Sequence, residues 1–307
     1  MTLRPALAVI VWFFLPLLAS GASAAADYPG MPAGKQGYDE FVALFDDFLL
    51  WLDPEQAKKQ QSMVDVAGLE ADVYPDFGAD AMAARLARLS EYQQQLDEFS
   101  VQEWPRDQQV EFLAVRARMD QEEFTLRVSR PWSRDPGFYV DRLLRPTFTE
   151  LPVAGDARRD FERVLDAIPG LVLQGKANLT DVAADYADLA IFNLANADGV
   201  GHGYPYRAVP PAGVIGWYDD LLERAAAEQP DLVPRIESAR AAVHGFRDWL
   251  DANRSAMTAN AGVGNAAFDW YLKHVKLMPY TSDEIVTLGR RELDRLWAQY
   301  ALERHRN

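Results

Sequence analysis

The 307-residue sequence contains no cysteine, which excludes disulfides, thiolate metal sites, cysteine nucleophiles and a lipidated cysteine at a cleavage site. Histidine is also scarce. The four histidines are His202, His244, His274 and His305, and no two of them lie three or four residues apart. A helical zinc site of the His-Glu-x-x-His kind needs two imidazoles one turn apart, so this motif is absent. The sequence therefore predicts no metal ligand.

Positive charge is also in short supply. The chain has 31 Lys and Arg residues against 46 Asp and Glu residues, and its formal net charge is -15. A surface this acidic repels phosphate backbones and anionic lipid head groups. We therefore expect no nucleic-acid partner. Because 49% of the residues are hydrophobic, the chain can still build a sizeable core and stabilise itself by packing.

Long apolar runs are missing except near the start of the chain. Arg4 is followed by an apolar run over residues 6–18 and by the small residues Ala22-Ser23-Ala24. This order is typical of a secretory signal peptide, and the run is short for a membrane span. We expect a signal peptide at 1–24 and an exported mature chain at 25–307, periplasmic or secreted, with no membrane contact after cleavage.

The sequence also lacks runs that alternate between apolar and polar residues, as β-strands do. Apolar residues instead recur at helical spacing, which predicts an all-α protein built from antiparallel helix pairs in an irregular bundle. The expected helices cover 41–52, 80–99, 110–128, 156–176, 180–195, 211–227, 232–253 and 265–275, with a final helix from Thr281. We expect Pro169-Gly170 to break or kink the fourth helix and Thr180 to cap the fifth.

Three segments rich in Trp, Tyr, Arg, Gly and Pro are predicted as loops, at 73–78, 129–139 and 197–213. Such loops can be binding surfaces or rigid connectors. In the second loop, the Arg134 guanidinium could hold a peptide carboxylate in bidentate geometry, or it could pair with Asp135 and fix the loop. For nucleophilic catalysis, the Gly-x-Ser-x-Gly motif is absent.

The final helix has a clear start signal and an apolar face. Thr281 and Glu284 match the capping box, in which two backbone donors at a helix start are satisfied. Six apolar residues recur along the helix, namely Ile285, Leu288, Leu293, Leu296, Trp297 and Tyr300. This face needs a partner to bury it.

Three stretches together resemble one bacterial family, the domain of unknown function 885 family. They are VYPDFGADAMAARLARL at 73–89, RPWSRDPGFYVDRL at 130–143 and the segment 263–295, which begins VGNAAFDWYLKHV. The resemblance implies relatives of about twice this length that look like helical zinc metallopeptidases, distantly similar to carboxypeptidases of the thermophilic type. It places their zinc-binding helix in a second half beyond residue 307, so no metal ligand or catalytic residue transfers to this chain.

The resemblance implies that this chain is the N-terminal, substrate-groove half of a zincin-like fold and is not catalytic alone. Its expected partners are a peptide substrate and a missing C-terminal half that covers the final helix. The expected substrate contacts are Trp132, Arg134, Asp135 and Tyr139. One alternative is a stand-alone exported binding module. Another is an independent hydrolase that uses His202, Tyr204 and acidic neighbours.

Overall fold

The computed structural model describes residues 37–52, 73–196, 207 and 209–306. Every regular element in these ranges is helical, which confirms the all-α prediction. None of the described helices is both long and apolar enough to span a bilayer. The expected signal peptide at 1–24, and also His202 and Tyr204, lie outside the described residues.

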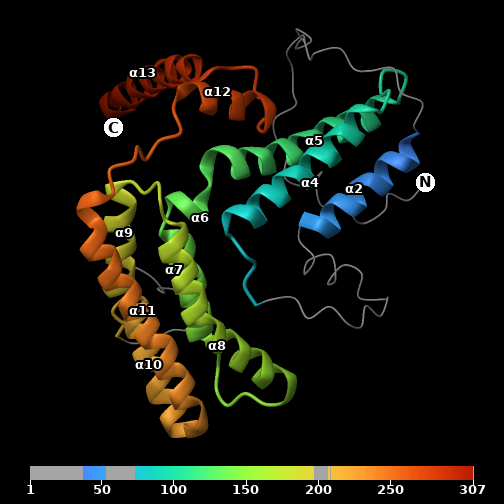
Figure 1. The fold of residues 1–307 in the computed structure, drawn as a ribbon. Helices are drawn as coiled ribbons and strands as arrows, with labels where there is room; N and C mark the ends of the chain where they lie inside the picture. The colour runs from blue at the N-terminus through green and yellow to red at the C-terminus, as the bar shows by residue number, and fades with distance from the viewer. Residues whose placement is uncertain (1–36, 53–72, 197–206, 208, 307) are drawn as a thin grey trace. The chain divides into compact units, whose positions relative to one another are not determined.

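The chain divides into two compact units, whereas the sequence suggests a single helical domain over 25–307 (Figure 1). The described part of unit 1 consists of 37–52, 85–124 and 264–306. The described part of unit 2 consists of 73–84 and 125–263 without 197–206 and 208. The helix α4 (Ala79–Asp97) contributes its first residues to unit 2 and the rest to unit 1.

Unit 1 is built around an aromatic core. Its further helices are α2 (Tyr38–Leu52), α5 (Arg106–Phe124), α12 (Asn265–His274) and α13 (Ser282–Arg306). The α2 helix ends at Leu52, the last residue of the predicted range 41–52. The ring of Phe41 on α2 lies 5.9 Å from that of Phe99, 5.5 Å from that of Trp104 and 5.8 Å from that of Phe112, between centroids. These are favourable distances for aromatic pairs.

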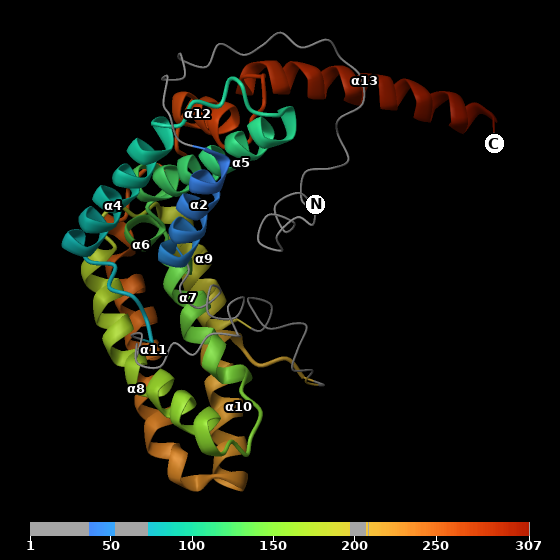
Figure 2. The ribbon, with the colours of Figure 1, turned by 90° about the vertical axis from the view of Figure 1, so that its right-hand side faces the viewer.

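Unit 2 packs its longer helices side by side. They are α8 (Gly155–Asn178), α9 (Ala184–Ala195), α10 (Gly213–Glu228) and α11 (Val233–Asn253). The α11 helix contacts the other three, and α10 and α11 lie next to each other after a short turn (Figures 1 and 2). The largest side chains of their core are fully buried: Trp217, Tyr218, Leu221, Ile236 and Phe246.

Close approach of α9 and α10 requires a glycine where α10 begins. Gly213 has φ +68, in the left-handed region that glycine tolerates best. A Cβ atom at this position would lie 2.6 Å from the carbonyl carbon of Leu194, near the end of α9. A larger residue would therefore push the two helices apart.

Three local predictions differ from the structure. The α8 helix continues through Pro169, so of the predicted break or kink at Pro169-Gly170 the break is wrong, and the kink stays a prediction. Thr180 does not cap α9, which begins at Ala184. Two backbone hydrogen bonds hold residues 180–183 outside the helix. Asp181 N–H donates to Ser133 O at 3.1 Å, and Val182 O accepts from Ala259 N–H at 3.1 Å.

The predicted loop at 129–139 is largely helical. A π-helical turn at Thr125–Ser129 is followed by α6 (Pro131–Arg134) and α7 (Gly137–Leu144). Pro131 occupies the first position of α6, where its fixed φ favours a helix start and its missing N–H costs no hydrogen bond. The segment is therefore a pair of short helices.

Candidate functional site

Two of the four predicted substrate contacts are packed inside unit 2. The side chain of Tyr139 has 0% exposure, and its hydroxyl donates to Trp132 O at 2.8 Å. Its ring lies against Gly175 on α8, where a Cβ would approach it to 3.1 Å. Trp132 is only 9% exposed. Tyr139 thus packs α7 against α8 and bonds to the α6 backbone, and the contact of either side chain with a substrate stays a prediction.

The Arg134 guanidinium is already occupied by protein oxygens. It donates to Asn260 O at 2.6 Å and to Gly262 O at 3.3 Å, and its Nε lies 3.5 Å from the Asp181 carboxylate. Of the two roles considered for Arg134, these contacts match the one that fixes a segment, with Asp181 in place of Asp135 as the acidic partner. Arg134 ties the segment 257–262 to α6.

Arg130 stands at the start of α6 in a strained conformation. Its φ of 36 and ψ of 57 are left-handed, a region that costs a non-glycine residue about 1–3 kcal/mol. Its side chain donates to the Asp181 carboxylate at 2.5 Å. Backbone strain of this kind persists only where the surrounding structure fixes it, and here Asp181 lies between Arg130 and Arg134.

Asp135 lines a hollow of about 280 Å³ between α7 and α9, which we call the Asp135 hollow. Burial raises the pKa of Asp135, the nearby Asp141 raises it further, and the hydrogen bond from Gly137 N–H opposes both. The lining is Pro131, Asp135, Gly137, Phe138, Asp141, Arg142, Tyr186, Leu189, Ala190 and Asn193.

The cation within the Asp135 hollow is held by aromatic rings. The Arg142 guanidinium lies 3.6 Å from the Phe138 ring centroid and 5.2 Å from that of Phe77, and it donates to Phe138 O at 2.6 Å. These contacts keep the guanidinium against the rings. Burial lowers the pKa of Arg142, and the nearby Asp141 carboxylate opposes that change, so Asp135 and Asp141 are the two carboxylates of the lining and Arg142 is its cation.

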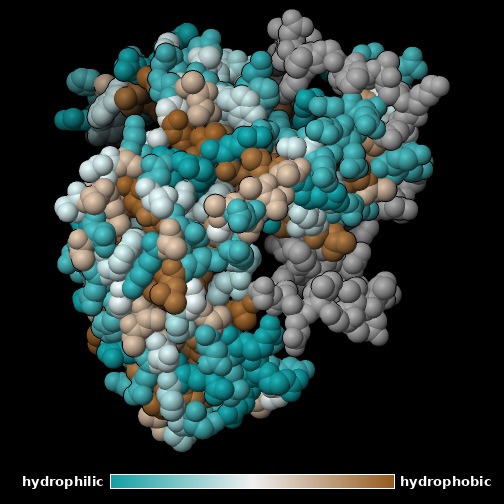
Figure 3. Space-filling view, in the orientation of Figure 1, coloured by the Kyte–Doolittle hydropathy of each residue, from teal (hydrophilic) through white to brown (hydrophobic). Residues whose placement is uncertain are grey.

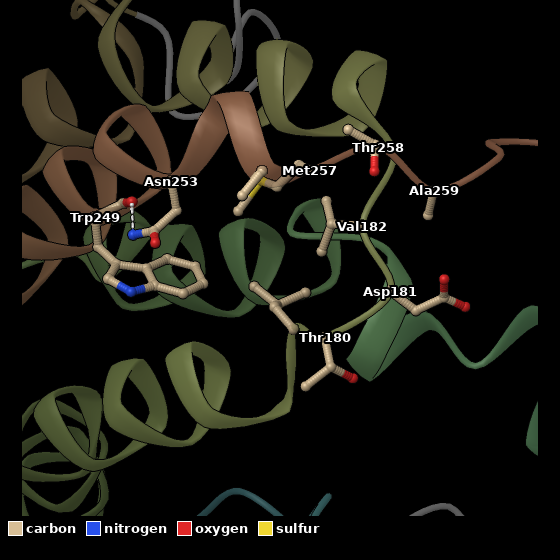
Figure 4. A pocket seen from close by; sticks show the side chains of 10 residues that line it. Thr180, Asp181, Val182, Trp249, Asn253, Met257, Thr258 and Ala259 are labelled. Carbon is tan, nitrogen blue, oxygen red and sulfur yellow. Dashed lines mark hydrogen bonds between the residues drawn. The ribbon is translucent and has the colours of Figure 1, made fainter.

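A second hollow of about 370 Å³ in unit 2 was not predicted from the sequence (Figure 4). We call it the Trp249 hollow. It lies where α8 and α11 end and two extended segments meet. Its lining consists of Leu179, Thr180, Asp181, Val182, Trp249, Asn253, Ala256, Met257, Thr258 and Ala259. The volume falls in the range of small-molecule sites, about 300–1,000 Å³.

Unit 1 carries a different feature, the apolar face of α13. The capping box is confirmed: Thr281 N–H donates to the Glu284 carboxylate at 2.8 Å, and Glu284 N–H donates to Thr281 Oγ1 at 3.3 Å. No residue of α13 is buried within the described chain, and Trp297 is 61% exposed. Its exposed large apolar residues are Val286, Leu288, Leu293, Leu296, Trp297, Tyr300 and Leu302.

Hydrophilic side chains cover much of the face drawn in Figure 3, with hydrophobic ones in small patches between them.

Among the described residues, no group of three or more His, Asp or Glu side chains is arranged to hold a metal ion. Within the part of the chain that the structure describes, one histidine lies within 4 Å of a carboxylate: in unit 1, His274 Nδ1 lies 3.8 Å from Asp120 Oδ2. That pair contacts the α4, α5 and α12 helices and is not part of either hollow.

Comparisons with known proteins identify one family and one similar structure. The model of a bacterial protein family of unknown function (DUF885) matches residues 62–306. The structure of a protein of unknown function from Shewanella oneidensis, proposed to be a lipoprotein, superposes with a TM-score of 0.61 at 16% identity. The match covers 85% of this chain and 46% of that one, so this chain spans less than half of that protein's length. A search of the curated proteins found no match.

Proposed function

The chain belongs to the DUF885 family of bacterial proteins, and we propose that it is the peptide-binding half of a larger exported protein. The observation that carries this proposal is the Asp135 hollow, which is formed by the same 130–143 segment that carries the family resemblance. Export is supported by the signal-like sequence at 1–24 and by the similar Shewanella oneidensis protein, itself proposed to be a lipoprotein.

The chemistry of the hollow suits a peptide that carries a positive group. Asp135 and Asp141 place two carboxylates beside the apolar wall formed by Leu189 and Ala190. An ammonium or guanidinium group at this position would interact favourably with both carboxylates and would counteract the rise in the pKa of Asp135. The methylenes of a Lys or Arg side chain would contact the apolar wall at the same time.

The exposed face of α13 supports the assignment to a larger protein. A stripe of large apolar side chains on a 25-residue helix is typical of an interface, because such stripes are buried in most stable proteins. We propose that the remaining polypeptide of the larger protein covers this face of α13. Zinc binding and peptide hydrolysis belong to that additional half, and both rest on the sequence resemblance alone. The proposal that the larger protein has a zincin-like carboxypeptidase fold also rests on the sequence resemblance alone.

Calorimetric titration with the peptide Ala-Lys-Ala tests the binding site. We expect the Asp135→Asn, Asp141→Asn double variant to bind at least tenfold more weakly than the natural chain, a loss of about 1.4 kcal/mol. Asp160→Asn, which removes one carboxylate from the exposed side of α8, is the matched control and should bind normally. Equal affinity in the double variant would contradict the proposal.

Co-expression tests the α13 interface. We expect this chain to copurify with the second half of a full-length relative, and a Leu293→Ser, Trp297→Ser variant to lose that association. Zinc content and peptide hydrolysis should appear only in the complex. A monomeric chain that binds peptides without any such half would instead favour the stand-alone binding module.

A further inference from the structure

The Trp249 hollow has the composition of a second recognition site, and we propose that it binds an aromatic side chain of a peptide ligand. This inference rests on the proposed function in one respect, that the ligand is a peptide. It concerns a different hollow from the one that contains Asp135, so the two can be tested separately.

The wall of the hollow is a pre-oriented indole. The Trp249 ring is parallel to the buried Phe246 ring within 7°, with centroids 6.2 Å apart. The Asn253 amide donates to Trp249 O at 2.8 Å, which ties two lining residues together (Figure 4). The indole is half-buried and lies beside the buried Phe246 ring while it still lines the hollow. Offset or edge-on contact with a second ring is favourable beyond the burial of area alone.

Val182 and Met257 add apolar groups to a lining that also contains the polar side chains of Thr180, Asn253 and Thr258. The side chains of Val182 and Met257 are both more than nine-tenths buried and still line the hollow, so packing fixes the part of the wall that they form. The Met257 thioether makes favourable contacts with aromatic rings. In Figure 4 Val182 and Thr180 lie across the hollow from Trp249. A ring that enters would be contacted from two sides.

Two polar groups in the lining can form hydrogen bonds with the backbone of a peptide. Neither the Trp249 indole N–H nor the Asn253 Oδ1 atom forms a hydrogen bond with any described residue. One is a donor and the other an acceptor, which matches the C=O and N–H of a peptide unit. This pairing favours an aromatic residue within a peptide over an isolated hydrocarbon.

The charge at the rim argues against a cationic ligand here. The Asp181 carboxylate is the only charged group of the lining, and it is already paired with Arg130 and close to Arg134. It also points away from Trp249 in Figure 4. The hollow therefore differs in specificity from the Asp135 hollow, and together they would select peptides that contain both a basic and an aromatic residue.

Fluorine NMR on the full chain labelled with 5-fluorotryptophan tests this inference. The Trp249 resonance is assigned by its loss in Trp249→Phe. Titration with N-acetylphenylalaninamide should shift that resonance saturably and leave the Trp297 resonance unchanged. N-acetylleucinamide should bind at least threefold more weakly. Ala256→Phe, at an exposed position of the lining, should fill the hollow and weaken binding at least tenfold without loss of folding.

The outcomes separate this inference from the proposed function. A saturable shift of Trp249 that Ala256→Phe removes supports the aromatic site even if Ala-Lys-Ala ignores the Asp135 hollow. An unmoved Trp249 resonance, an Ala256→Phe variant with unchanged affinity, or equal affinity for the leucine probe would each overturn it. Binding of Ala-Lys-Ala would in that case leave the Asp135 hollow as the one peptide site.

Discussion

Asp120 in unit 1 allows a quantitative prediction of how stability depends on pH. Its side chain lies on α5 and is only 8% exposed as a residue. Burial, the largest influence, raises its pKa from 3.8 to about 6. The titratable and polar groups that surround it are Gln93 and Asp97 on α4, Arg116 and Glu123 on α5, and His274 on α12.

The sign of the pH dependence of stability follows from the upward shift in the pKa of Asp120. A folded-state pKa above the unfolded value means that the folded protein binds the proton more tightly, so folding is favoured at low pH. The contribution is complete below about pH 4 and is lost as the pH rises through about 6. The rise from 3.8 to about 6, at about 1.4 kcal/mol for each pH unit, corresponds to about 3 kcal/mol.

Asp120→Asn should remove this dependence, because an amide has nearly the same shape and does not ionise. The variant should gain up to about 3 kcal/mol in free energy of unfolding relative to the natural chain between pH 4 and pH 8. His274 contributes with the opposite sign, since burial lowers its pKa. At pH 8 it is neutral, so its 3.8 Å approach to Asp120 is not an ion pair there.

Urea unfolding at pH 4 and pH 8 measures the difference, with hydrogen exchange of α5 and α12 amides to place the effect in unit 1. Asp97→Asn is the control, because Asp97 faces the same cluster with a half-exposed side chain. We expect the control to show a much smaller change with pH. If Asp120→Asn and the natural chain keep the same difference in stability at both pH values, the buried and ionisable state of Asp120 is refuted.

Three further predictions concern packing, anchoring and capping. Gly175→Ala brings a Cβ to 3.1 Å from a buried ring and should cost about 1–3 kcal/mol in thermal unfolding, whereas Gly170→Ala in the same helix has no atom within 4 Å and should stabilise by about 0.5–1 kcal/mol. Arg134→Ala should accelerate amide exchange around Asn260, and protection as in the natural chain would contradict its anchoring role. Thr281→Ala should fray the first turn of α13 at a cost of about 1 kcal/mol, visible as faster exchange there alone.

The elements that the sequence predicted well depend on local chemistry. The capping box of α13 follows from residues within one turn of each other. The start of α9 was predicted wrongly because Thr180 belongs to a segment that bonds to Ser133 and Ala259, both distant in sequence. Helical capping rules cannot anticipate such partners.

The candidate site was harder to predict for the same reason. The family resemblance directed attention to Asp135, which does line a hollow. The partners of Arg134 lie 126 and 128 residues further along the chain, so its anchoring contacts could not be read from spacing. The Trp249 hollow combines residues 179–182 with residues from 249–259, and only folding brings those segments together.

The division into units determines the order in which the chain can fold during synthesis. Unit 2 draws most of its residues from the continuous stretch 125–263, whereas unit 1 needs 37–52, 85–124 and also 264–306. As the chain emerges from its N-terminus, α5 must wait for its partner α12, whereas the residues of unit 2 have already been synthesised. Closing unit 1 across that insertion costs loop-closure entropy, so the contacts of Phe124 on α5 with Trp270 and Tyr271 on α12 are the last of its aromatic contacts to form. The aromatic core around Phe41 uses residues that precede 125 and does not depend on that closure.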